Sequence, residues 1–397
     1  MSMIYLSQLG MISPLGNSLD ATKRALLELA RSGVASSDDY SPGRPLPLGR
    51  IDGNLPLLPM DDWPLPDRSR NNQIALAALR QIRPAVESAI ERFGGARVGV
   101  VIGTSTSGVA EAEAALRDYV STGALPEAFH YGQQELASPA TVLATELGIC
   151  GPVYVHSSAC ASSAKALASA ARLIRMNACD AVLAGGVDTL CRFTVAGFAA
   201  LESLSTTRCN PLSRNRDGIN IGEGAALFLV SREPATVSLR GWGESSDGYH
   251  MSAPDPAGVG GRLALEQALA RAAVTAADIE YVNLHGTATV QNDAMEAELV
   301  HRVFGGHHVF VSSTKPFTGH ALGAAGAIEA GLCWLAMQDD NPTGKLPAHL
   351  WDGSDDPKLP VLQLATLATR LGHPPRWAVS NSFAFGGANV TLVLARD

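Results

Sequence analysis

A reactive thiol stands where an apolar run gives way to a small-residue segment. Cys160 follows the apolar run 153–155 and precedes residues 161–171, almost all of which are small. A thiol at the N-terminus of such a helix lies in the positive end of the helix dipole, which favours the thiolate. A thiolate there suits a nucleophile that carries an acyl group. The alternative for this stretch, taken alone, is a buried cysteine that packs as a small apolar residue.

Two histidines also follow predicted strands. His285 comes after the apolar residues 281–284, and His320 begins a second small-residue helix over 321–330. The dipole at a helix N-terminus disfavours imidazolium, so we expect a neutral His320 that donates an N–H to a carbonyl becoming an enolate. Taken alone, His285 is more often a structural hydrogen-bonding residue. No carboxylate or cysteine stands at ligand spacing near the two histidines, so we expect no metal site.

A run rich in phenylalanine and glycine, residues 383–389, lies near the C-terminus. Its glycines permit backbone dihedrals that other residues avoid. Backbone N–H groups near Phe385 suit an oxyanion hole, and Phe383 and Phe385 suit the wall of an apolar tunnel. A glycine-rich turn between two strands is the alternative.

The elements that must position these residues alternate between strands and helices. We expect strands at 3–12, 97–103, 153–156, 180–188, 225–231, 235–241, 281–284, 309–314, 377–380 and 390–395, the one at 235–241 at a sheet edge. Helices are expected at 20–31, 69–93, 109–119, 138–147, 161–171, 262–273, 293–303 and 321–330, with loops at 34–66 and 189–223. The continuously apolar strands predict parallel strands covered on both faces.

A repeated pattern of strand, turn and helix divides the chain into two parts. Residues 309–330 repeat the design of 153–171, a strand, a polar turn with a reactive side chain, then a small-residue helix. The spacing of about 155 residues is too long for a solenoid repeat. We therefore expect two similar halves, residues 1–240 carrying the nucleophilic cysteine and residues 241–397 carrying the two histidines.

Composition excludes several classes of protein. The chain has 397 residues, 46% of them hydrophobic and 17% charged, with a net charge of −8. The acidic balance argues against nucleic-acid binding. We expect no membrane span because no run of roughly 18 apolar residues occurs. The six cysteines lack metal or CxxC spacing, and the N-terminus lacks a signal-peptide pattern, so we expect a cytoplasmic protein with reduced thiols.

Taken together, the motifs resemble those of a known family. They are Cys160 within 158–163, His285 within 283–289, Lys315 and His320 within 313–320, residues 216–218 with 222–225, and residues 381–389. In this order they are similar to the β-ketoacyl-acyl-carrier-protein synthases, the elongating Cys-His-His condensing enzymes of the thiolase superfamily. The resemblance spans essentially the whole chain.

The resemblance implies a thiolase-like five-layer αβαβα sandwich and a homodimer or a heterodimer with a related synthase subunit. It implies that Cys160 takes an acyl chain from the phosphopantetheine of acyl carrier protein. Malonyl-carrier protein then loses CO2, and its enolate attacks the thioester to give a 3-oxoacyl-carrier protein two carbons longer. No bound cofactor is implied, and the pathway is fatty acid, polyketide or aryl-polyene biosynthesis.

Further roles follow by the same resemblance. His285 and His320 stabilise the enolate, and the backbone N–H groups of Cys160 and Phe385 hold the tetrahedral intermediate. Lys315 supports the histidine site, through Glu329. Thr287 and Thr289 match positions that bind the pantetheine arm. Because carrier proteins are acidic, we also expect a basic patch at the tunnel mouth, with Arg68, Arg70 and Arg208 as candidates.

Two departures from the family pattern bear on the substrate. Ala384 stands between the two phenylalanines where the family usually has glycine, and Ser157-Ser158 replaces a Thr-Ala lead-in to the cysteine. Neither touches the reacting groups. Acyl chain length, saturation, an aromatic starter and the identity of the dimer partner stay open.

Three alternatives are weighed against the condensing enzyme. A thiolase-type acyltransferase uses a second cysteine as base, and residues 381–389 contain none. Initiating condensing enzymes have an asparagine where His320 stands. A non-elongating chain-length-factor subunit lacks the nucleophile, which Cys160 supplies.

Overall fold

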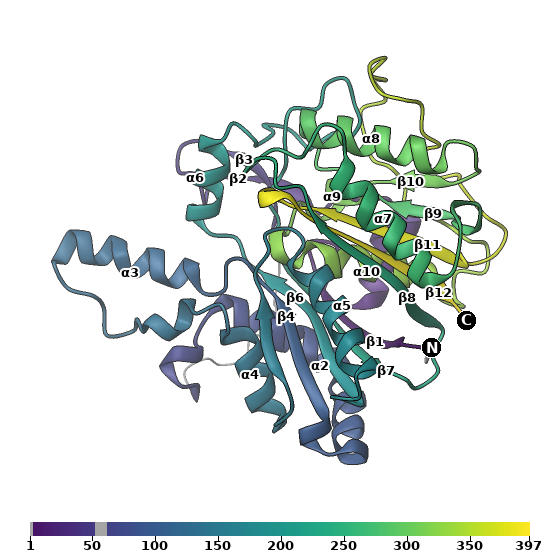
Figure 1. Ribbon diagram of the computed structural model, residues 1–397. Coiled ribbons are helices and arrows are strands. Elements are labelled where there is room, and N and C mark those ends of the chain that lie inside the picture. Colours follow the sequence, from purple (N-terminus) through teal and green to yellow (C-terminus); the bar gives the residue numbers. More distant parts are fainter. Residues whose placement is uncertain (1–2, 52–61) are drawn as a thin grey trace.

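Five strands from the first part of the chain form one half of the main sheet. The computed structural model describes residues 3–51 and 62–397 (Figure 1). Within this described part the strands are β1 (Tyr5–Ile12), β4 (Val98–Gly103), β5 (Val153–His156), β6 (Ala181–Asp188) and β7 (Gly224–Ser231). Their order is β1-β7-β6-β4-β5. Strands β5, β4 and β6 are parallel, and β7 is antiparallel to both β6 and β1.

The second part of the chain repeats this arrangement. Its strands are β8 (Val237–Ser246), β9 (Tyr281–Asn283), β10 (Phe310–Ser312), β11 (Trp377–Phe383) and β12 (Ala388–Arg396). Their order, β8-β12-β11-β9-β10, has the same parallel and antiparallel pairings as the first set. The two sets join where β1 pairs with β8 through Tyr5 and Ser238. Strands β5 and β10, which precede Cys160 and His320, therefore hold equivalent positions in the two sets, whereas β9, which precedes His285, is the equivalent of β4.

Helices cover both faces of each set of strands, which gives five layers. The outer layer over the first set contains α2 (Arg70–Phe93) and α4 (Ser138–Leu147), and the outer layer over the second contains α7 (Val259–Ala272) and α8 (Val290–Phe304). The central layer contains α5 (Ser162–Arg175) and α10 (Ala325–Ala336), which contact strands of both sets (Figure 1).

The two central helices pack closely because their residues are small. A methyl group added at Gly326 of α10 would lie 2.9 Å from the Cβ atom of Ala164 in α5. Ser163 of α5 also accepts a hydrogen bond from the backbone N–H of Ala327, at 2.9 Å. Such close packing lets the residues before the two helices approach one another, as the sequence predicts.

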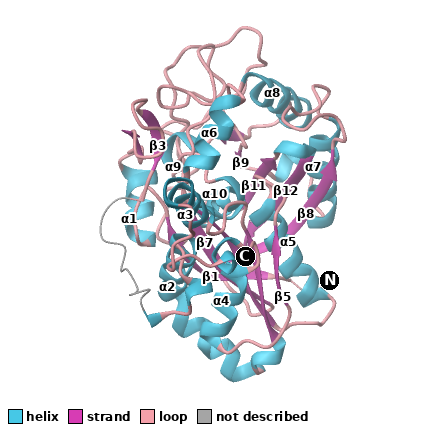
Figure 2. Ribbon diagram, turned by 90° about the vertical axis from the view of Figure 1, so that its left-hand side faces the viewer, coloured by secondary structure: helices cyan, strands magenta, loops and turns pink. Residues whose placement is uncertain are grey.

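The remaining elements lie around these layers. They are α1 (Leu19–Lys23) with a π-helical continuation η1 (Arg24–Glu28), the hairpin of β2 (Val34–Ser37) and β3 (Leu46–Gly49), α3 (Val109–Thr122), α6 (Arg192–Ala200), α9 (Lys315–Thr318), and the 3-10 turns η3 (Leu65–Asp67), η4 (Gly95–Arg97), η5 (Tyr131–Gln134), η6 (Ala276–Asp278), η7 (Leu322–Ala324) and η8 (Phe385–Gly387). Helix α3 projects from the body in Figure 1 and is seen end-on in Figure 2.

The structure corrects four expectations about these elements. The segment expected as an edge strand is β8, which lies between β12 and β1 in the middle of the sheet. Gly241 and Gly243 are where α7 approaches this strand, because a methyl group there would meet the Ala268 and Ala264 carbonyl oxygens at 2.1 and 1.8 Å.

The other three corrections concern loops and a helix start. The expected loop 189–223 contains α6, and the expected loop 34–66 contains β2 and β3, whereas residues 52–61 lie outside the described part. The second small-residue helix begins at Ala325, after the 3-10 turn η7, rather than at residue 321. Among the described residues, no helix has the length and apolar character needed to cross a bilayer.

Candidate active site

Cys160 lies at the tip of a tight turn between β5 and α5. The preceding residue, Ala159, has a left-handed backbone with φ 47°, a conformation that a non-glycine residue adopts only under local constraint. Ser162 supplies that constraint, because its hydroxyl accepts from the Ser158 N–H at 2.8 Å and donates to the Ala159 carbonyl at 2.6 Å. The cysteine is buried and stands just before α5 begins at Ser162.

The thiol of Cys160 is neutral in this setting. Burial raises its pKa to about 11, and the charge of Lys315 and hydrogen bonds from the Phe385 and Cys160 backbone N–H groups oppose that rise. The predicted thiolate is therefore not the resting form, because desolvation outweighs the helix dipole. The same two N–H groups, which hold down the pKa of the thiol, are the pair predicted as the oxyanion hole.

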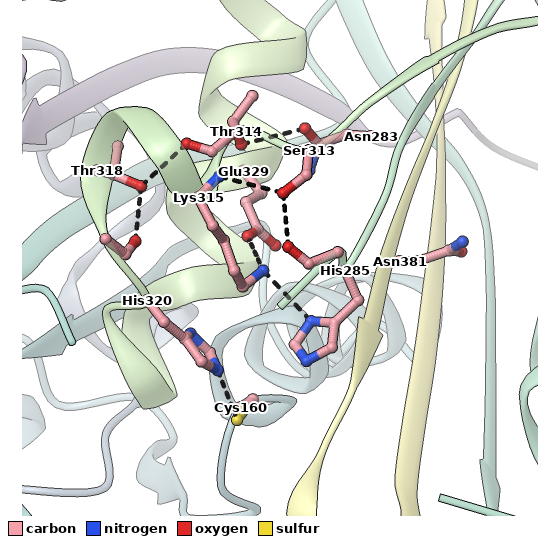
Figure 3. A network of polar contacts seen from close by, with 12 residues as sticks. Cys160, Asn283, His285, Ser313, Thr314, Lys315, Thr318, His320, Glu329 and Asn381 are labelled. Carbon is pink, nitrogen blue, oxygen red and sulfur yellow. Dashed lines mark hydrogen bonds and ion pairs between the residues drawn. The ribbon is translucent and has the colours of Figure 1, made fainter. Parts of the chain in front are cut away.

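His320 faces the cysteine directly. Its Nε2 atom lies 2.9 Å from the Cys160 Sγ atom (Figure 3). The backbone is fixed on both sides, since the His320 N–H donates to the Asn220 carbonyl at 2.6 Å and its carbonyl accepts from Gly222 at 2.9 Å. Burial and the charge of Lys315 hold the pKa of His320 well below its usual value. The imidazole is neutral, as predicted, but the cause is burial and a neighbouring cation rather than the dipole of α10, which begins five residues later.

His285 stands beside His320 at the end of β9. The two ring centroids are 5.4 Å apart, with an interplanar angle of 83°. Burial, Lys315 and His320 all hold the pKa of His285 well below its usual value, so this imidazole is neutral as well. The backbone N–H groups of His285 and Gly286 both donate to the carboxylate of Glu296, at 2.8 and 2.7 Å, which holds the turn in place.

Lys315 fixes the tautomer of His285. Its Nζ atom lies 3.4 Å from His285 Nδ1 and forms a buried ion pair with Glu329 (Figure 3). An ammonium group has donors only, so Nδ1 of His285 must accept and Nε2 must carry the proton. The predicted pairing of Lys315 with Glu329 is therefore present, and it leaves the His285 N–H available to a substrate.

The predicted substrate-binding residues line one cavity with the nucleophile and the two histidines. They are Thr287, Thr289, Phe383 and Phe385. The hydroxyls of Thr287 and Thr289 lie 2.9 Å apart. Ala384 also lines the cavity, with an extended backbone of φ −105° and ψ 156°, so alanine fits this position without strain.

Two residues at the site were missed by the sequence analysis. Phe198 of α6 lines the cavity, and its ring centroid is 5.4 Å from that of Phe385. The stretch around Phe198 looked irregular, so no helix placed its side chain. Glu296 was passed over because its distance from His285, 11 residues, has no meaning until α8 folds back beneath the turn. Its burial raises the pKa of Glu296 to about 7.

The three candidate arginines do not gather at the cavity. Arg70 forms an ion pair with the buried carboxylate of Glu223. The Nε atom of Arg68 donates to the Trp63 carbonyl at 2.7 Å. Arg208 lies in the loop between α6 and β7. None of these three described side chains lines the cavity.

The expectation of no metal site was based on the spacing of residues along the sequence. The fold brings residues that are far apart in the sequence close together in space. One ligand atom from each of Cys160, His285 and His320 lies within 4.8 Å of the others. A cation held there would face the Lys315 ammonium, which contacts His285. A metal-free site therefore stays our prediction, on the ground of charge rather than spacing.

Comparison with known proteins identifies the family. Residues 67–235 match the β-ketoacyl synthase N-terminal domain, and residues 236–347 match the C-terminal domain. The chain is 29% identical to 3-oxoacyl-[acyl-carrier-protein] synthase 2 of Staphylococcus aureus, over 99% of this chain and 98% of the relative.

Solved structures agree. The chain is 43% identical to a chain of the complex between the ketosynthase ApeO and its chain length factor ApeC from Xenorhabdus doucetiae, with TM-score 0.93 and coverage of 100% and 98%. A chain of the ishigamide ketosynthase/chain length factor is 25% identical, with TM-score 0.88 and coverage of 100% and 99%.

The chain therefore belongs to the β-ketoacyl synthase family. It is a condensing acyltransferase with the thiolase-like α/β fold that its motifs predict.

Proposed function

We propose that the site joins an acyl chain held on Cys160 to a malonyl unit by decarboxylative Claisen condensation. The observation that carries this proposal is the convergence of one sulfur, two neutral imidazoles and two backbone N–H groups in a buried cavity. These are the groups that thioester exchange and enolate formation require.

In the first stage the sulfur of Cys160 attacks the acyl thioester of the carrier protein. With its proton on Nε2, which lies 2.9 Å from the sulfur, His320 stabilises the small thiolate fraction that a raised pKa allows. The Cys160 and Phe385 backbone N–H groups hold the oxyanion of the tetrahedral intermediate. The pantetheine sulfur leaves as thiolate and takes up a proton, which balances the proton lost by the cysteine.

In the second stage the malonyl thioester loses CO2, and the electron pair of the broken C–C bond forms the enolate. The Nε2–H groups of His285 and His320 donate to its oxygen. The enolate carbon attacks the carbonyl of the Cys160 thioester, the C–S bond breaks, and the sulfur takes up a proton from solvent, which balances the negative charge of the malonyl carboxylate. The product stays on the carrier as a 3-oxoacyl thioester two carbons longer.

Acyl carrier protein is the proposed partner in both stages. The name of the Staphylococcus aureus relative supports this choice. Thr287 and Thr289 of the cavity are the proposed contacts of the pantetheine arm. Arg68, Arg70 and Arg208 stay the proposed contacts of the acidic carrier protein, and the guanidinium of Arg70 also faces Glu223. Phosphopantetheine arrives with the substrate, and no bound cofactor takes part.

We also propose that the chain works as a dimer with a second synthase subunit, identical or related. The projecting helix α3 supports this proposal, because Leu116, Tyr119 and Val120 are 59%, 49% and 86% exposed (Figures 1 and 2). Strand β5 ends the sheet and is half-buried. The ApeO complex supports a chain length factor as the second subunit.

Mass measurement in solution tests the dimer. Val120→Lys should shift the assembled protein to monomer, whereas Val361→Lys, at a residue 92% exposed on a distant loop, should leave it unchanged. Equal behaviour of the two variants would refute the interface.

We further propose that the chain is two similar halves. The repeated strand order supports this division. The expected boundary at residue 240 falls inside β8, so we place it in the connection 232–236 between β7 and β8. Location in the cytoplasm stays a proposal, based on the acyl-carrier substrates.

The proposed reaction is tested by mixing the enzyme with acyl- and malonyl-carrier protein and measuring the carrier-bound product by mass spectrometry. The wild-type chain should produce a 3-oxoacyl-carrier protein. Cys160→Ala should abolish it while acyl-carrier binding is retained. Product formation at an undiminished rate by Cys160→Ala would refute the mechanism.

A further inference from the structure

A buried carboxylate outside the cavity holds the turn that carries His320. Asp188 is the last residue of β6 and has no exposed surface. Its Oδ2 atom accepts a hydrogen bond from the backbone N–H of Gly323 at 2.6 Å. Gly323 is three residues after His320 and belongs to the 3-10 turn η7 that leads into α10. This hydrogen bond links the first part of the chain to the second part, next to the catalytic histidine His320.

The other contacts of this carboxylate come from the turn after β4. Its oxygens accept from the hydroxyl of Thr104 at 2.6 Å, from the N–H and hydroxyl of Ser105 at 2.8 and 2.5 Å, and from the N–H and hydroxyl of Thr106 at 2.9 and 2.8 Å. Three of the donors are backbone N–H groups, which only donate, so the arrangement fits an ionised carboxylate. Burial raises the pKa of Asp188, and the hydrogen bonds from Ser105 and Thr104 oppose this rise.

The turn that Asp188 holds is not stable by its own sequence. Leu322 has a left-handed backbone, φ 47°, which a leucine adopts only when its surroundings impose it. Helix α10 has no side-chain cap of its own at Ala324. A carboxylate near the N-terminus of a helix satisfies free N–H groups and interacts favourably with the dipole. Asp188 satisfies the N–H of Gly323, two residues before α10, and places a negative charge near the N-terminus of that helix from a different layer of the fold.

The space around Gly323 also leaves no room for a side chain. A methyl group added at Gly323 would lie 2.7 Å from Asp188 Oδ2 and 2.8 Å from the Ser105 backbone nitrogen. Residue 323 must therefore be glycine if the turn is to reach the carboxylate. The other side of His320 is fixed by Asn220 and Gly222, so Asp188 supplies the remaining constraint.

We propose that Asp188 is a positioning residue for the condensation, which sets the place of the His320 imidazole against Cys160 by anchoring Gly323 from the opposite half of the chain. This inference rests on the proposed function for its effect on rate. A displacement of about 1 Å at a catalytic group lowers rates by about a hundredfold. The role predicts that loss of Asp188 affects steps that use His320 and leaves carrier binding intact.

The test compares three variants of the full chain. Asp188→Asn places an N–H₂ group among donors, and Gly323→Ala pushes the turn away from an intact carboxylate. Thr104→Val is the matched control, because it removes a buried hydroxyl from the same carboxylate and leaves the Gly323 contact untouched. Each variant is measured for thermal unfolding, for malonyl-carrier decarboxylation, and for the pH profile of Cys160 alkylation by iodoacetamide.

We expect kcat for decarboxylation to fall by about ten- to a hundredfold in Asp188→Asn and Gly323→Ala, with KM for malonyl-carrier protein within about threefold of wild type. Alkylation should slow by about three- to tenfold at a given pH, because the His320 N–H no longer supports the thiolate. Thr104→Val should stay within about threefold of wild type in both assays.

Equal losses in Asp188→Asn and Thr104→Val, or losses that follow only the folded fraction, would overturn the inference. If Asp188→Asn does not fold, Gly323→Ala decides the matter alone. If the wild-type chain does not decarboxylate malonyl-carrier protein, the proposed function fails, and the alkylation profiles, which need no carrier protein, still test the positioning role.

Discussion

Replacing Lys315 with methionine should separate the catalytic role of this residue from its structural one. The ammonium holds the His285 tautomer at 3.4 Å, pairs with the buried carboxylate of Glu329, and lowers the pKa of Cys160. Both partners of the ion pair are almost fully buried, with side chains 1% and 3% exposed. Methionine keeps the length of the side chain and removes all three effects.

The magnitude of each effect follows from the contacts. Loss of one fixed donor to a developing oxyanion lowers kcat by about a hundred- to a thousandfold, so condensation by Lys315→Met should fall by at least that range. Breaking a buried ion pair by removing one partner destabilises a protein by about 3–5 kcal/mol, because the remaining charge is unpaired. Alkylation of Cys160 should also slow, since the largest influence that opposes the raised pKa of the thiol is removed.

The stability of this variant depends on pH in a definite direction. Burial raises the pKa of Glu329, and Lys315 opposes this rise, so its removal raises that pKa further. An acid whose pKa is higher in the folded state is protonated more readily there, so folding gains at low pH and the gain is lost as pH rises. The free energy of unfolding of Lys315→Met should therefore lie closer to wild type at about pH 5 than at about pH 8.

The double variant Lys315→Met/Glu329→Gln is the decisive control. It removes both charges and should regain most of the lost stability in urea unfolding, because a neutral pair in place of a buried ion pair is often tolerated. It should not regain condensation, since His285 still lacks the group that fixes its tautomer. Recovery of both stability and activity in the double variant would refute the proposed role of Lys315.

Three further predictions concern the thiol, the histidine beside it and the wall of the cavity. Because burial raises the pKa of Cys160 to about 11, its alkylation rate should keep rising with pH throughout the neutral range, and a plateau near neutrality would show that the dipole prevails. His320→Ala should lower malonyl-carrier decarboxylation by about a hundred- to a thousandfold, and full activity would contradict the oxyanion role. Phe198→Ala removes the ring whose centroid lies 5.4 Å from that of Phe385 and should raise KM for long acyl chains more than for short ones. The assay is single-turnover acylation of Cys160 across a series of chain lengths. The same change in KM for all chain lengths would argue against a role of Phe198 in the acyl pocket.

The sequence predicts most of the fold because its strongest signals are local. Buried strands such as β4 and β6 are continuous apolar runs, and α2 and α4 have clear helical periodicity, so their bounds agree with the structure within a few residues. Strand β8 is predicted as a strand, but its place in the middle of the sheet depends on pairing with β12 and β1, which no local pattern shows. Helix α6 is short and contains a glycine, so its pattern is too weak to detect.

The sequence predicts which residues form the site but not the protonation state of the cysteine. The motifs select Cys160, His285, Lys315 and His320, and the fold brings them together. The resting thiol state could not be predicted, because it depends on how deeply the fold buries the sulfur. The hydrogen bond from Gly323 to Asp188 could not be predicted either, because 135 residues separate them and only the packing of two layers makes them neighbours.

The central claim is that Cys160 carries the acyl chain between the two stages, and mass spectrometry of its peptide tests this most directly. The enzyme is incubated with a panel of acyl-carrier proteins that differ in chain length, saturation and aromatic starter, and digested before and after malonyl-carrier protein is added. The account predicts an acyl adduct on Cys160 that malonyl-carrier protein discharges into a product two carbons longer. An adduct on another residue, or one on Cys160 that malonyl-carrier protein leaves in place, would contradict it.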